Sequence, residues 1–300
     1  MEKKLYERIG EEVFRATLPN GLPVYIVPKK GFSRKYALFA TRYGGMDMRF
    51  EKDGQWLDTP AGIAHYLEHK MFDTEEGNAL QELAKNGAEP NAFTSNAITC
   101  YYFDATEKFY ESLEILLSFV SVPYFTDESV QKEQGIIAQE IGMIEDNPEW
   151  QVYKQLMQAL YHTSPARTPV AGSVESISHI TAQTLYDCHK AFYTPANMCL
   201  VVVGDVDADK VLETARRILP ESSGRQERPA DPPRLRRGGG ADRRGAFRLR
   251  RHGGVHAHVP GGLQVPAPAR RGGAAPVHRH RRAGLRCAHG RVQPAVRPAV

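Results

Sequence analysis

Cysteine is scarce in this chain, with four among 300 residues, and no two of them form a Cys-x-x-Cys pair. Cys287 belongs to an unusual C-terminal segment, described below. The other three lie within apolar patterns that are typical of strands and helices. We therefore expect Cys100, Cys188 and Cys199 to be buried, reduced thiols.

Long apolar runs are also absent. No stretch approaches the ~18 apolar residues that a membrane-spanning helix requires. Residues 1–8 lack the apolar core of a signal peptide, and the acidic Glu2 and Glu7 argue against a mitochondrial transit peptide. These absences predict a cytoplasmic, bacterial protein without a membrane partner.

The C-terminal quarter lacks whole classes of residue. Residues 225–300 contain no Lys, Ile, Ser, Thr, Asn, Met, Tyr or Trp, but they contain 18 Arg and 12 Gly. Phe247 is their only Phe, Tyr or Trp, so they hold too little apolar surface to offset the entropy of ordering the chain. We predict a folded domain over residues 1–224 and a disordered tail over residues 225–300.

The composition of the tail also indicates its origin. The absent residues have largely AT-rich codons, whereas the abundant Arg, Gly, Ala and Pro have GC-rich codons. We interpret the tail as an out-of-frame translation of GC-rich DNA, with the change of frame between Leu219 and Arg234.

Net charge has a different meaning in the two parts. The chain as a whole carries a net charge of +4. The tail has 18 Arg and only three acidic residues, a net charge of +15, so residues 1–224 carry −11. An Arg/Gly-rich tail resembles segments that bind RNA, but this one lacks the aromatic residues on which bases stack. We therefore predict no nucleic-acid partner.

Residues 65–69 read His-Tyr-Leu-Glu-His within an apolar segment, residues 61–72. On a helix, His65 and His69 lie one turn apart on the same face and can bind one metal ion. Glu68 lies on the same side, where it could take a proton from a metal-bound water. This order of residues is that of the inverzincin zinc peptidases.

A zinc site needs a third protein ligand, which we expect from a predicted helix over residues 127–145. Glu133 and Glu140 are seven residues apart, two helical turns, so their carboxylates share one face. A solvated acidic stripe would show the same spacing, and we accept that interpretation for Glu128 and Glu145. From spacing alone, the third ligand stays open.

Five blocks, taken in order, resemble the insulinase, pitrilysin and mitochondrial processing peptidase family of inverzincin zinc metallopeptidases. The blocks are residues 65–69, 87–94, 133–140, 192–198 and 201–206. Further segments near residues 31–44, 135–141 and 172–180 look most like a bacterial subgroup, the YfmH type of insulinase-like proteins.

This resemblance implies roles for individual residues. His65, His69 and Glu140 would be the ligands of a Zn²⁺ cofactor, Glu68 the general base, and Glu133 a supporting carboxylate of the catalytic site. Asn91, Ala92, Phe93 and Thr94 would belong to an edge strand that binds a substrate peptide as an added strand. A plain hairpin strand is the alternative for this segment.

We predict an α+β fold with a mostly antiparallel sheet and helices packed on it. Asn20-Gly21 is a strong hairpin signal between strands over residues 13–18 and 22–28. Further strands are expected at residues 35–43, 99–105 and 198–203. Helices are expected over the His-x-x-Glu-His segment and at residues 78–86, 109–120, 127–145, 149–161, 182–192 and 207–219.

The predicted function is a zinc-dependent endopeptidase that hydrolyses extended peptides. By resemblance, active members combine this domain with further related domains, so we expect a second related domain or a homodimer partner. The alternatives are a catalytically silent scaffold subunit of a peptidase pair, or an inactive truncated product. The sequence does not specify the physiological substrate.

Removal of residues 225–300 should leave the thermal midpoint of unfolding nearly unchanged, because a segment without apolar surface adds nothing to the core. Thermal unfolding curves of the full and shortened chains check this. A protease-resistant fragment within residues 225–300 would contradict it.

Sequencing the gene through codon 225 tests the proposed change of reading frame. The corrected frame should restore Lys, Ser, Thr and Ile and encode a second related domain.

Overall fold

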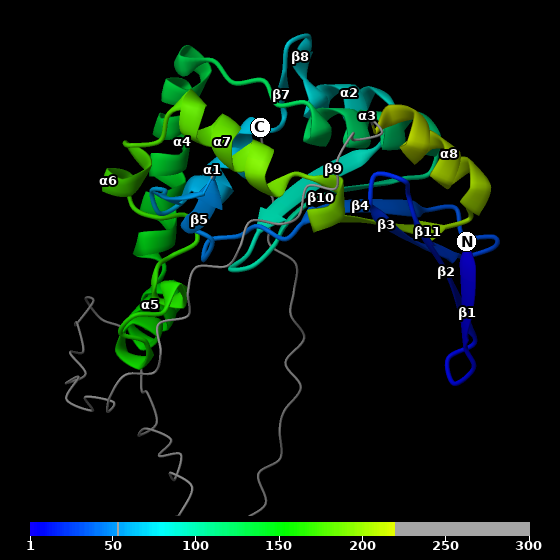
Figure 1. Cartoon of the computed structure of the whole chain (residues 1–300), viewed down its shortest axis with the longest axis horizontal. Coiled ribbons are helices and arrows are strands. Elements are labelled where there is room, and N and C mark those ends of the chain that lie inside the picture. The colour runs from blue at the N-terminus through cyan, green and yellow to red at the C-terminus, as the bar shows by residue number, and fades with distance from the viewer. Residues whose placement is uncertain (53, 220–300) are drawn as a thin grey trace, which may run out of the picture. The chain divides into compact units, whose positions relative to one another are not determined.

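A computed structural model of the chain describes residues 1–52 and 54–219. The predicted tail, residues 225–300, and most of the expected frame change lie outside the described residues. Seven strands form one sheet in the order β1-β2-β3-β11-β4-β10-β9 (Figure 1). They are β1 (Glu2–Tyr6), β2 (Glu11–Thr17), β3 (Pro23–Pro28), β4 (Lys35–Thr41), β9 (Glu89–Thr94), β10 (Thr99–Ala105) and β11 (Met198–Gly204).

Every neighbouring pair in this sheet is antiparallel except β11 and β3, which run parallel. The predicted α+β fold with a mostly antiparallel sheet is therefore confirmed. Two small hairpins lie outside the sheet, β5 (Arg49–Lys52) with β6 (Gln55–Asp58), and β7 (Asp73–Thr74) with β8 (Gly77–Asn78). Neither hairpin, nor β1, is among the elements predicted from the sequence.

Asn20 and Gly21 form the predicted turn between β2 and β3. The Oδ1 atom of Asn20 accepts a hydrogen bond from the Leu22 backbone N–H at 3.2 Å. Gly21 has a φ of 91°, a left-handed conformation that side chains rarely adopt. A Cβ at this position would lie 3.3 Å from the Cβ of Ala196, so the turn also packs closely against the segment before β11.

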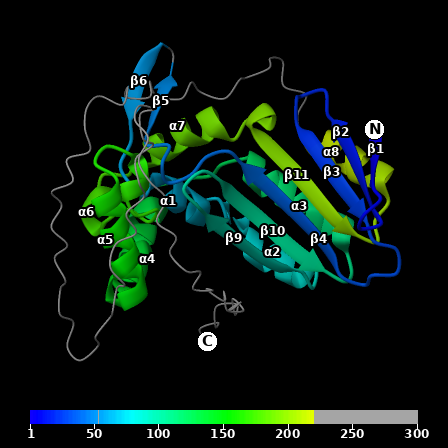
Figure 2. The ribbon, with the colours of Figure 1, turned by 90° about the horizontal axis from the view of Figure 1, so that it is seen from below.

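Apart from α6 (Val174–Ile177), which was not predicted, the helices follow the predicted ranges to within a few residues. They are α1 (Ile63–Lys70), α2 (Ala79–Lys85), α3 (Phe109–Ser121), α4 (Asp127–Asp146), α5 (Pro148–Leu160), α6 (Val174–Ile177), α7 (Ala182–Phe192) and α8 (Ala208–Ile218), with 3₁₀ turns at Pro165–Arg167 and Pro195–Asn197. Helices α2, α3 and α8 lie along one face of the sheet, and α4, α5 and α6 gather beside one end of it (Figures 1 and 2).

The core lies between the sheet and its helices. Alternate residues of the central strands point into it, as the period of a strand requires. In β11, for example, Leu200 and Val202 are fully buried while Val201 and Val203 are half-buried. From the helices, Leu113, Leu117 and Val211 complete the apolar cluster.

Cys100, Cys188 and Cys199 are free thiols. Cys100 and Cys188 are buried as predicted, whereas Cys199 is only half-buried because it lies on the less covered face of β11. Cys287 lies outside the described residues. Among residues 1–52 and 54–219, no helix is long and apolar enough to cross a membrane.

His189 on α7 is a buried, neutral histidine in this core. Its Nε2 atom lies 3.0 Å from the Val120 carbonyl oxygen, to which it can donate, and its ring stacks on Tyr193 with centroids 4.7 Å apart. Burial lowers the pKa of His189 to about 4, and the hydrogen bond to Val120 opposes this only in part. The folded protein therefore holds this ring in its neutral form at neutral pH.

The free energy of unfolding should fall as pH falls from about 6.5 to about 4, because the unfolded histidine binds a proton in this window and the folded one does not. In the glutamine variant His189→Gln, which keeps a donor but cannot ionise, this loss should be smaller by about 3 kcal/mol. Urea unfolding at pH 7 and pH 4, with a chelator present for both proteins, measures the difference. Equal losses in the two proteins would contradict this assignment.

Candidate metal centre

Helix α1 begins at a close approach between two segments. Gly62 precedes it with a φ of 93°, and a Cβ there would lie 2.5 Å from the carbonyl oxygen of Ala171. From this start, α1 buries Ile63, Ala64 and Leu67. With that face docked in the core, His65 and His69 are directed toward α4.

The two histidines lie one turn apart, with ring centroids 4.6 Å apart. Glu140, from the middle of α4, lies opposite both. Its carboxylate oxygens are 3.5 Å from Nε2 of His65 and 3.4 Å from Nε2 of His69. One ligand atom from each of the three side chains lies within 4.8 Å of the others.

The two separations between Glu140 and the histidines fit a tetrahedral zinc ion. Two ligand atoms that are each ~2.1 Å from a tetrahedral metal are about 3.4 Å apart. Two imidazoles and one carboxylate are also a donor set found in catalytic zinc sites, where the fourth position stays open for water. The residues present could therefore hold zinc.

The pKa values of His69 and Glu140 are strongly shifted by their mutual contacts. Burial acts to lower the pKa of His69, but hydrogen bonds to Glu133 and Glu140 and the charge of Glu68 raise it to about 10. Hydrogen bonds from His65 and then His69 hold the pKa of Glu140 well below its usual range. A metal ion would supply the positive charge that a proton supplies here, so binding releases protons.

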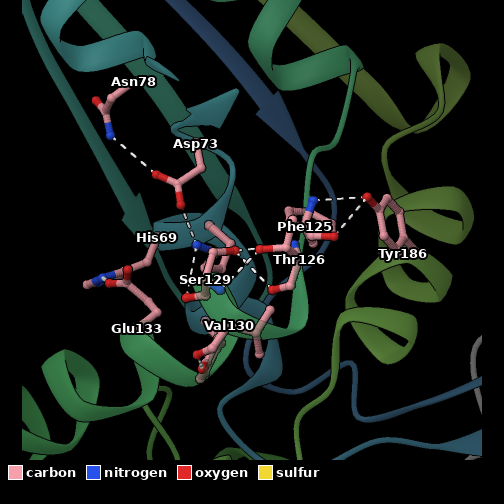
Figure 3. A network of polar contacts seen from close by, with 11 residues as sticks. His69, Asp73, Asn78, Phe125, Thr126, Ser129, Val130, Glu133 and Tyr186 are labelled. Carbon is pink, nitrogen blue, oxygen red and sulfur yellow. Dashed lines mark hydrogen bonds and ion pairs between the residues drawn. The ribbon is translucent and has the colours of Figure 1, made fainter. Parts of the chain in front are cut away.

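Glu133 lies two turns before Glu140 on α4 and contacts the other side of the His69 ring. The Glu133 Oε1 atom lies 3.0 Å from Nδ1 of His69 (Figure 3). A carboxylate in this place orients the ring and its tautomer, so that Nε2 faces Glu140. The two glutamates therefore hold the same histidine from its two nitrogen atoms.

Glu68 points to the sheet side of α1 and is 8% exposed. Its Oε2 atom accepts a hydrogen bond from the Thr94 hydroxyl at 2.7 Å. Thr94 is the last residue of β9, so the predicted base and the predicted substrate-binding strand are directly connected.

Strand β9 is the last strand of the sheet and pairs only with β10 among the described residues. Ala92 and Thr94 face α1, whereas Asn91 and Phe93 face the other side, where Phe93 is 41% exposed. The segment is thus both an edge strand and one arm of a hairpin, and the binding of a peptide to residues 91–94 stays a prediction.

A cavity of about 730 Å³ opens beside His65 and Glu140, between the end of β9, helices α4 and α5, and the segment over residues 166–172. Its apolar lining includes Trp150, Tyr153 and Met157 of α5. For these residues the sequence predicts only a helix, and their place in a cavity was not predicted. What could have indicated it is that α5 carries large apolar residues, although none of its residues is buried in the core.

Comparison with known proteins identifies the family. The model of the insulinase family, peptidase family M16, matches residues 54–174, and a model described as the peptidase M16 inactive domain matches residues 179–266. The chain therefore belongs to the M16, or insulinase, family of peptidases, as the ordered blocks predicted. The second match crosses residue 225, and the domain boundary there stays a prediction.

Individual relatives agree with this assignment. An uncharacterized zinc protease of Bacillus subtilis, YmfH, is 44% identical over 234 residues, which cover 77% of this chain and 54% of the relative. An uncharacterized zinc protease of Mycobacterium leprae is 30% identical, covering 88% of this chain and 58% of the relative. The chain thus spans little more than half the length of these relatives.

Solved structures show the same architecture. A putative M16-like peptidase from Alicyclobacillus acidocaldarius is 42% identical, with a TM-score of 0.69, covering 73% of this chain and 52% of that one. A protease from Helicobacter pylori is 26% identical, with a TM-score of 0.63, covering 71% and 50%.

Protein purified without a chelator should carry about one zinc ion per chain, and His69→Ala should abolish this binding because two ligands do not hold the ion. Glu140→Gln should weaken it strongly. Atomic absorption measures the zinc content, with His162→Ala, which removes an exposed histidine, as the control. Full zinc content in Glu140→Gln would move the third ligand to another carboxylate.

Proposed function

We propose that the protein is a zinc-dependent endopeptidase that hydrolyses extended peptides. The observation that carries this proposal is the convergence of His65, His69 and Glu140 on one point, with Glu68 on the same helix as the two histidines. Membership of a peptidase family, with relatives named zinc proteases, supports it.

Zinc bound by these three residues would supply Lewis-acid chemistry and lower the pKa of a water molecule toward ~7. Glu68 would accept the proton of the attacking water and return it to the amine that leaves. The Thr94 hydroxyl occupies one oxygen of the Glu68 carboxylate and fixes its orientation. Glu133 would hold the His69 ring in place.

The peptide would bind in an extended conformation along β9, through backbone hydrogen bonds to its open edge. Asn91, Ala92, Phe93 and Thr94 would provide this edge. The edge ends at Thr94, which contacts Glu68 and also lines the cavity beside the metal centre. A large apolar side chain of the peptide would fit the lining of Trp150, Tyr153 and Met157.

The complete peptidase would include a second related domain or a homodimer partner, since the chain spans about half the length of its relatives. A silent scaffold subunit is the alternative. The presence of all three candidate ligands, the base and Glu133 favours a catalytic role. A cytoplasmic location stays a prediction.

In a full-length, in-frame protein, Glu68→Gln should keep zinc but lower the turnover of an unstructured peptide by ~10²-fold or more, because it removes a base and no ligand. A fluorogenic peptide assay and zinc analysis, performed on the same preparation, separate chemistry from binding. Glu128→Gln changes an exposed glutamate at the start of α4 and serves as the matched control. Unchanged turnover in Glu68→Gln would exclude this residue as the base.

A further inference from the structure

Lys70, the residue after His69, is a buried lysine with 1% of its surface exposed. A buried ammonium group is costly unless it is paired. Lys70 forms an ion pair with Asp73 and lies 3.3 Å from the carbonyl oxygen of Ser129, in the first turn of α4. This lysine therefore joins the end of α1 to the start of α4.

A second contact from the same face of α1 reaches the same place. The Tyr66 hydroxyl donates a hydrogen bond to the carbonyl oxygen of Val130, the residue after Ser129. Tyr66 and Lys70 are one helical turn apart, so they form a row beside that of His65 and His69. One row contacts the start of α4, and the other faces Glu133 and Glu140.

The start of α4 is itself held by its neighbours. Thr126 caps the helix and forms a reciprocal pair of hydrogen bonds with Ser129. The Tyr186 hydroxyl of α7 contacts both the N–H and the carbonyl oxygen of Phe125, as Figure 3 shows. Contacts to Ser129 and Val130 therefore act on an ordered helix end.

We propose that Lys70 and Tyr66 are positioning residues of the metal centre, which fix where α4 lies along α1 and thereby where Glu140 stands relative to the two histidines. This inference rests on the proposed zinc site. Glu140 is ten residues beyond Val130, or ~15 Å along the helix. A shift of α4 by one residue would move it by ~1.5 Å, whereas metal–ligand distances tolerate only ~0.2 Å.

A purely stabilising ion pair would have different consequences. Buried ion pairs contribute little net stability, and a well-fitting apolar replacement often preserves the fold. In Lys70→Met, the partner Asp73 keeps about a third of its side chain exposed to water, so no buried charge is left without a partner. Stability and metal geometry can therefore be separated.

The test compares zinc dissociation constants of the full chain, measured by competition with a chromophoric chelator, and the visible absorption spectra of the Co²⁺-loaded proteins. Lys70→Met should bind zinc ~10–100-fold more weakly and alter the Co²⁺ spectrum, as changes in residues that orient ligands do. Tyr66→Phe should weaken binding in the same direction. Lys29→Met, which removes a lysine paired with Glu11 of β2, should match the wild type in both measurements.

Wild-type affinity and spectrum in both Lys70→Met and Tyr66→Phe would overturn the proposal. If Lys70→Met does not fold, Tyr66→Phe decides, because it removes only a hydroxyl group. A wild-type protein that binds no zinc would overturn the proposed function and this inference together. Zinc binding by the wild type with unaffected variants would remove only the positioning role.

Discussion

The packing of α1 against α4 is the constraint on which the candidate site depends. His65 and His69 are brought together by the helix itself, but Glu140 comes from a helix that starts more than fifty residues later. Helix α1 has eight residues, too few to be stable alone. Its conformation therefore comes from its burial and from the close approach of Gly62 to Ala171. The chemistry of the site is thus a property of tertiary structure.

Features that depend on neighbours in sequence could be predicted. The spacing of His65 and His69 implies one helical face and Asn20-Gly21 implies a turn, and both lie in the structure as expected. The helix predicted over residues 127–145 is likewise present as α4. The same holds for β10, whose run of β-forming residues predicts its bounds. Local conformational preferences and periodicity decide these elements, and the sequence displays them directly.

Features that depend on distant pairing could not be predicted in this way. Strand β11 inserts between β3 and β4 and runs parallel to β3, although nearly 160 residues separate it from β4 in the chain. The apolar sequence of β11 does not indicate which strands it pairs with. The choice between Glu133 and Glu140 is open from spacing for the same reason, since both share a face of α4 and only the position of α1 distinguishes them. The cavity beside Trp150 likewise requires four separate segments of the chain.

The distribution of the three candidate ligands over two helices has a consequence for folding kinetics. A zinc ion held by His65, His69 and Glu140 gains its full set of ligands only after α1 and α4, which are far apart in the sequence, have docked. Before docking, the ion has two ligands at most, so it favours the native state over any transition state in which the two helices are still apart. Interactions absent from the transition state slow unfolding and leave the folding rate almost unchanged. Zinc supply would therefore govern how long a folded molecule survives, and not how quickly it forms.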